Sequence, residues 1–118
     1  MTMQPRVEIT KQVPLAYTVP ATHRVKIAEL CPLTGRATSV TMHFPDGCTG
    51  LVHVAFGHSD KWVAPSEINT FISLNDATPV FPTNEPVVRN EYLWAEIRNG
   101  SANPQPISVI VTIEGREE

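Results

Sequence analysis

Apolar and polar residues alternate with a period of two over five segments of this chain, and that period predicts β-strands. The clearest case is "ISVIVTIE" at 107–114, where aliphatic side chains at every second position form one face. The five segments are residues 23–30, 37–44, 51–56, 91–98 and 107–114. Shorter candidates are residues 6–13, 15–19, 61–64, 70–74 and 78–81. Each segment has an apolar face, which two packed sheets would bury.

Proline and turn-forming residues separate these segments. The chain has 11 prolines among 118 residues, spread along its whole length. Proline lacks a backbone donor and clashes with the preceding helical turn, so long helices are not expected. Turn sequences occur at 32–35, 45–50, 57–60, 75–79 and 99–106. About eight strands with turns at intervals of roughly 8–12 residues predict an all-β fold, an antiparallel β-sandwich or single jelly roll.

The first 20 residues contain Pro5, Pro14 and Pro20 and predict an extended arm. We therefore divide the chain into an N-terminal arm at 1–20 and a β-sandwich domain at 21–118. Such an arm can lie across its own domain or across a neighbour, where it adds a strand to a sheet edge.

The composition of the chain restricts the kinds of molecule that it is expected to bind. The net charge is −3 and the basic residues are scattered singly, so we expect no binding to nucleic acid or to an anionic membrane. The start, "MTMQPRVEIT", lacks the apolar core of a secretion signal. No apolar run approaches the length of a membrane span. Protein partners are the expectation.

The stretch "HFPDGCTGLVHVAFGHSD" at 43–60 concentrates side chains that bind metals or act as nucleophiles. The parity of its apolar positions predicts a hairpin around 45–50, with His43 opposite His53 on the outer face. Two imidazoles with Cβ atoms about 4.5–5.5 Å apart can share a metal or titrate together. The same parity predicts five core residues: Met42, Phe44, Val52, Val54 and Phe56.

A metal site needs more ligands than this histidine pair. His58 is the third candidate, but it lies beyond Gly57, and a strand rises about 3.3 Å per residue, so it is too far from His53 to share a metal. The spacing also departs from the cupin pattern of two histidines separated by one residue. We expect an ordinary polar sheet face with no catalytic residue and no cofactor, and His43, His53 and His58 are only minor candidates for metal ligands.

The two cysteines, Cys31 and Cys48, carry no recognisable nucleophile motif. Cys48 lies in a turn flanked by glycines, and no base with an orienting group accompanies it in the sequence. We expect two free, buried thiols rather than a disulfide.

Aromatic residues mark a second face of the predicted sandwich. Tyr92 and Trp94 lie opposite the apolar face of segment 91–98, and Ile110 lies on the outward face of segment 107–114, between Ser108 and Thr112. We expect this outer face to be covered by the N-terminal arm or by another subunit, because tyrosine and tryptophan are enriched at interfaces. The alternative is a sugar-binding platform that uses Trp62 and Trp94.

Four segments in order resemble a known group of proteins: "FPDGCTGLVHVAF", "KWVAPSE", "NDATPVF" and "EYLWAEIRNGSANPQPISVIVTIEG". Together they resemble small β-sandwich proteins encoded among the structural genes of tailed bacteriophages and related viruses, over residues 25–115. The resemblance implies a capsid decoration or cement protein, or a module of tail and fibre assemblies, usually a homo-oligomer. It brings no catalytic residues, and it implies localisation in a virion assembled in the host cytoplasm.

These observations give three hypotheses. The first is a non-enzymatic, virion-associated structural protein that binds capsid proteins or copies of itself through sheet edges, its arm and its aromatic face. The second is a carbohydrate-binding or receptor-binding head, and the third is a cupin-like metal-binding protein. The predicted interface residues are Val7, Ile9, Val13, Leu15, Tyr17, Tyr92, Trp94 and Ile110.

Overall fold

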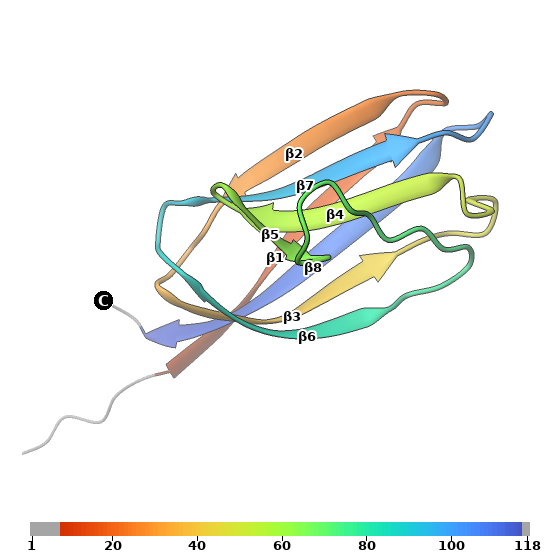
Figure 1. The fold of residues 1–118 in the computed structure, drawn as a ribbon. Helices are drawn as coiled ribbons and strands as arrows, with labels where there is room; N and C mark the ends of the chain where they lie inside the picture. Colours follow the sequence, from red (N-terminus) through yellow and green to blue (C-terminus); the bar gives the residue numbers. More distant parts are fainter. Residues whose placement is uncertain (1–7, 117–118) are drawn as a thin grey trace, which may run out of the picture.

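The computed structural model describes residues 8–116, and these form two four-stranded antiparallel sheets packed face to face (Figure 1). The strands are β1 (Glu8–Val19), β2 (Arg24–Leu30), β3 (Gly35–His43), β4 (Val52–His58), β5 (Lys61–Ala64), β6 (Val80–Val87), β7 (Tyr92–Asn99) and β8 (Gln105–Arg116). The predicted all-β sandwich is confirmed. The strand orders are β1-β8-β3-β6 and β2-β7-β4-β5, the arrangement of a single jelly roll.

The core lies between the two sheets and contains the residues that the alternation predicts. The inner faces of β7 and β8 place Leu93, Ile97 and Val111 in it without exposure. The five core residues predicted from segment 43–60, namely Met42, Phe44, Val52, Val54 and Phe56, are all fully buried as well. Period-two alternation therefore identified the side chains that hold the sheets together. Removing an apolar face from water is favourable, so the apolar face of each strand turns toward the core.

The described part of the predicted arm is a strand of the protein's own sheet. β1 pairs with β8 along its whole length, from Glu8 opposite Arg116 to Val19 opposite Gln105. The predicted boundary after residue 20 falls at the turn between β1 and β2. Residues 1–7, which include the predicted contact residue Val7, lie outside the described part of the chain.

The predicted hairpin around residues 45–50 is wrong. β3 pairs with β6 and β8, whereas β4 pairs with β5 and β7, so the turn carries the chain from one sheet to the other. The inner faces of both strands still meet in one core, which is why the parity of the apolar positions was correct. Parity fixes which face is buried, but a packed strand and a hydrogen-bonded strand satisfy it equally well.

The connection between β5 and β6 closes one side of the sandwich. Val54 and Ile72 exchange backbone hydrogen bonds of 2.8 and 2.9 Å, and Phe44 pairs in the same way with Ala77. The connection therefore contacts both β4 and the residue that follows β3, and in Figure 1 it runs in green across the front of the molecule. Its predicted strand at 70–74 is reduced to the single bridge at Ile72.

Candidate functional site

The three histidines of segment 43–60 lie at separate places in the fold. His43 is opposite Ser108 on β8, and its Nδ1 lies 2.8 Å from Oγ1 of Thr78. His53 is opposite Arg98 on β7, in the other sheet. The predicted His43–His53 pair is therefore wrong, for the same reason as the hairpin. Within residues 8–116, no group of three or more histidine, cysteine, aspartate or glutamate side chains has the geometry to hold a metal ion.

His58 is the histidine with a developed polar environment. It ends β4 and contacts Glu85 from β6 and Glu91 from the turn before β7. Its Nε2 lies 2.9 Å from Oε1 of Glu85, and its Nδ1 contacts Oε1 of Glu91. A carboxylate can only accept, so both ring nitrogens must donate, and the arrangement fits an imidazolium. Lys61 Nζ adds a contact of 2.8 Å to Glu85.

The pKa values of this cluster follow from these contacts. Burial by itself lowers the pKa of His58, but the hydrogen bonds to Glu85 and Glu91 outweigh burial and raise it above its ordinary value. Burial raises the pKa of both carboxyls, but hydrogen bonds outweigh it and lower both pKa values. At Glu85 these come from Lys61 and His58, and at Glu91 from His58, the backbone N–H of Val88 and Ser59. The cluster is thus a neutral ion network that ties three separate segments together at one end of the sandwich.

A shallow cavity of about 420 Å³ lies beside this network. Its lining includes His58, Lys61, Trp62 and Ile68. Both nitrogens of His58 are already committed to carboxylates, so the ring has no nitrogen left to act as a general base or a metal ligand. The geometry supports a structural role for the cluster.

The two cysteines are free and buried, as expected. Cys31 Sγ donates to the carbonyl of Leu33 at 3.1 Å, and Cys48 Sγ lies 3.9 Å from Oε1 of Gln105. Burial is the main cause that raises the pKa of both thiols. Both side chains are therefore held as neutral thiols, the less reactive form.

Of the aromatic outer face, Trp94 is covered by the protein's own chain rather than by the predicted arm or another subunit, whereas Tyr92 is exposed. Trp94 is only 4% exposed, and Trp62 packs edge-on against it with ring centroids 5.1 Å apart. Phe71, from the β5–β6 connection, packs in turn on Trp62. Lys26 Nζ, from β2, lies over the ring of Trp94, 4.4 Å from its centroid. Trp94 is therefore too buried to serve as an exposed platform for a sugar ring.

Glycine at position 57 allows this arrangement. Gly57 lies opposite Trp94 in the β4–β7 ladder and opposite Trp62 in the β4–β5 ladder. A Cβ atom at this position would overlap the indole ring of Trp94 and the carbonyl oxygen of Lys61. The indole therefore lies across the strand, and its Nε1 donates to the carbonyl of Ser59 at 2.9 Å.

The strands at the two sides of the sandwich differ in how well their outer edges are protected from pairing with another strand. On one side, edge strand β6 carries Pro82 and Pro86, and β5 has only four residues and leads into the connection that pairs with β4. Short strands, proline and covering segments are the usual protection of a sheet edge. On the other side lie β1, of 12 residues with a single proline, and β2, of seven residues with none. No strand formed by residues 8–116 pairs with the outer edge of either.

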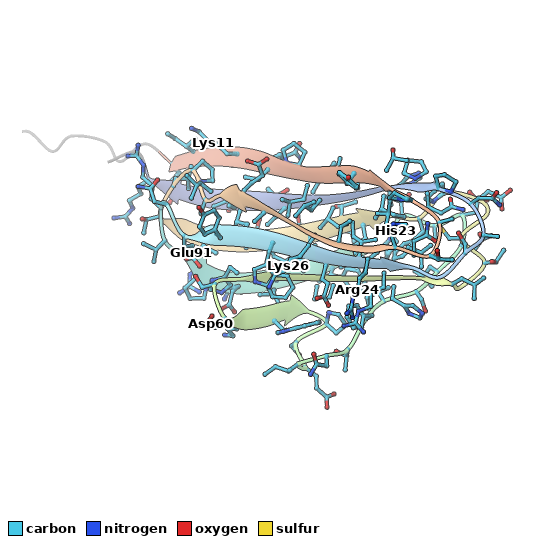
Figure 2. The ribbon with its side chains drawn as sticks, turned by 90° about the horizontal axis from the view of Figure 1, so that it is seen from above. Lys11, His23, Arg24, Lys26, Asp60 and Glu91 are labelled. Atoms are coloured by element: carbon cyan, nitrogen blue, oxygen red, sulfur yellow. The ribbon has the colours of Figure 1, made fainter. Side chains whose placement is uncertain are left out.

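We call this second side the open edge, meaning the outer strands β1 and β2, which run close to each other in Figure 2. Exposed apolar side chains accompany it. Leu30 at the end of β2 is 51% exposed, and its cross-strand neighbour Tyr92 is 59% exposed. This exposed apolar pair lies at one end of the open edge, where strand addition to β2 would bring another chain close to it.

The predicted interface residues divide between surface and core. Tyr17 and Tyr92 are exposed, and Ile9 and Ile110 are half-buried. Val13 and Leu15 are buried in the core and Trp94 under Trp62, so these three side chains are not on the surface of the described protein. Sequence reasoning missed Glu85, Glu91 and Arg98, since nothing in their local sequence indicates the distant segments they contact.

Comparison with known proteins shows the fold. No protein-family model matches the chain, and no curated protein matches it. A solved protein of Bacillus endospore appendages, described as a novel family of disulfide-linked pili, is 13% identical, with a TM-score of 0.57 over 100% of this chain and 96% of that one. The crystal structure of FlhE is 14% identical, with a TM-score of 0.53 over 93% of this chain and 98% of that one. At these identities the likeness concerns architecture alone.

Proposed function

We propose that this protein is a non-enzymatic structural subunit that associates with copies of itself through the open edge. The observation that carries the proposal is the asymmetry of the sandwich: one side is closed by prolines and by the β5–β6 connection, whereas β1 and β2 end both sheets on the other side. Strand addition at such an edge supplies backbone hydrogen bonds in fixed register.

Two independent resemblances support a structural subunit. The sequence resembles small virion proteins of tailed phages, and the fold is similar to that of an appendage subunit. Both kinds of protein build particles from repeated copies. The finer predictions, a capsid decoration protein and a virion location, stay predictions; immunogold labelling of phage particles and of cell-surface fibres would distinguish them.

The association would not use disulfides within the described chain, although the appendage protein belongs to disulfide-linked pili. Both cysteines of residues 8–116 are buried and unpaired. Burial of Leu30 and Tyr92 and pairing along β1 and β2 are the interactions that we propose instead.

Sedimentation velocity over a wide range of protein concentration tests this proposal. A structural subunit should form species larger than the 13.0 kDa monomer as concentration rises. A protein that stays monomeric at every concentration, and forms no particle under the electron microscope, would overturn the proposal.

A further inference from the structure

Four basic or titratable side chains gather at one end of the outer face of the β2–β7–β4 sheet. Arg24 on β2 lies opposite Arg98 on β7, and Arg98 lies opposite His53 on β4, so the three occupy one row on one face. Cβ atoms of such neighbours are about 4.5–5.5 Å apart. His23 immediately precedes Arg24, and Figure 2 shows both toward the same end of the sandwich.

Two arginines directly opposite each other repel, and the described surroundings neutralise them only in part. The nearest carboxylate is that of Glu96, with Oε2 3.4 Å from Nη2 of Arg98. Glu96 is itself opposite Lys26. No salt bridge within residues 8–116 includes Arg24. The outward positions of β2 and β7 thus carry three cations against one anion, in a chain whose net charge is −3.

A cavity of about 350 Å³ opens at this row. Arg24, His53 and Arg98 line it together with His23, and its lining contains no carboxylate. Leu51 adds an apolar rim that is 48% exposed.

The guanidinium of Arg98 is held in place beside this cavity. Its Cζ lies 4.5 Å from the centroid of the Phe71 ring, and its Nε is buried with no hydrogen-bond partner among the described residues. A guanidinium stacked on an aromatic ring keeps its remaining N–H groups in a fixed planar fork, the geometry that matches an oxyanion. The neighbouring Arg24 is exposed and supplies a second fork from the adjacent strand.

We propose that this cavity binds a compact oxyanion, a phosphate, sulfate or carboxylate group, either free or carried on an acidic sugar. Arg24 and Arg98 would bind the anion from adjacent strands. His23 donates its Nδ1–H to the carbonyl of Ala21 at 2.8 Å, which holds its ring at the rim. The proposal does not depend on self-association: Arg24 belongs to edge strand β2, but its side chain lies with Arg98 and His53 on the outer face of the sheet.

Calorimetric titration of the full chain tests the proposal, with ionic strength held constant by chloride. The ligands are inorganic phosphate, inorganic sulfate, glucuronate and, as the neutral control, glucose. We expect saturable binding of an oxyanion and none of glucose. Arg24→Gln should weaken binding about tenfold, the usual loss for one charge-assisted hydrogen bond. Arg36→Gln, which changes an exposed arginine on β3, should bind as the wild type does.

The variants separate binding from folding. Arg98→Gln removes the contact with Phe71 and so can alter the fold, whereas Arg24 is exposed and its variant should keep the circular dichroism spectrum of the wild type. Binding of phosphate or sulfate supports a site for free anions, and binding of glucuronate alone supports an acidic sugar. If no oxyanion binds, or if Arg24→Gln binds as tightly as the wild type, the proposal is wrong.

Discussion

His58 and Glu85 lie on strands of different sheets, yet Nε2 of the imidazole is 2.9 Å from Oε1 of the carboxylate. With Glu91 on the other ring nitrogen, the contact requires a doubly protonated ring. The stability of the sandwich should therefore depend on pH through this residue.

The raised pKa of His58 gives the direction of the effect at high pH. Its stabilising contribution is complete below the ordinary value of 6.5 and is lost as the pH rises through the raised value in the folded protein. The lowered pKa values of Glu85 and Glu91 act at the other end: their contribution is complete above 4.5 and is lost as the pH falls through the lowered values. The network is most stabilising between these limits.

We expect the melting temperature to fall by a few degrees between about pH 5.5 and about pH 8.5 because of this network, and His58→Gln to reduce that difference. Differential scanning calorimetry at both values measures it. His43→Gln, at an exposed histidine outside the network, is the matched control and should keep the wild-type difference. An unchanged pH dependence in His58→Gln would show that another group causes it.

Gly57 gives a prediction about packing. A methyl group there overlaps the Trp94 ring, so Gly57→Ala should destabilise the fold by roughly 1–3 kcal/mol and change the near-ultraviolet circular dichroism of the tryptophans. Gly50→Ala is the control, since its φ of +74° is unfavourable for alanine but a Cβ atom there meets no atom within 4 Å. It should cost about 1 kcal/mol and leave the tryptophan signal unchanged. Equal tryptophan spectra in the two variants would contradict the packing described for Trp94.

The buried thiols give a chemical prediction. Cys31 and Cys48 are at most 1% exposed, and burial raises the pKa of both. A thiol-reactive dye should label neither in the native protein and both after denaturation in guanidinium chloride. Non-reducing electrophoresis should show no covalent multimers. Rapid labelling of the native protein, or covalent multimers that a reductant separates into monomers, would contradict this prediction and indicate assembly through disulfides.

The local pattern of apolar residues was sufficient to predict which residues are buried in the core, but not which strands pair with each other. The alternation around Val52 and Val54 identified both as buried, since burial depends on the polarity of each residue and on its parity. The supposed pairing of His43 with His53 needed a further fact, namely whether the turn at 45–51 stays in one sheet. Whether it does so depends on β7 and β8, which are distant in sequence. These strands form the backbone hydrogen bonds with β4 and β3 that a hairpin would have formed between β3 and β4.

The same limit explains the functional surfaces. His58 is conspicuous in the sequence, but its partners Glu85 and Glu91 follow it by 27 and 33 residues and carry no local signal. The cover over Trp94 was also beyond sequence reasoning, because Trp62 reaches it only through the pairing of β5 with β4. The prolines of β6 were visible from the start, but they indicate a closed edge only once β6 is placed at the edge of its sheet.

The central claim, association through the open edge, is tested most directly by sedimentation velocity of charge variants. Ala16 on β1 and Ala28 on β2 are exposed edge positions, and lysine on an edge strand opposes strand addition. We expect the wild type to form large species and the double variant Ala16→Lys, Ala28→Lys to remain at the monomer mass of 13.0 kDa, with its melting temperature nearly unchanged. Val80→Lys, at an exposed position on the closed side, should assemble as the wild type does. Assembly of the double variant at the wild-type concentration, or loss of assembly in Val80→Lys alone, would contradict the account.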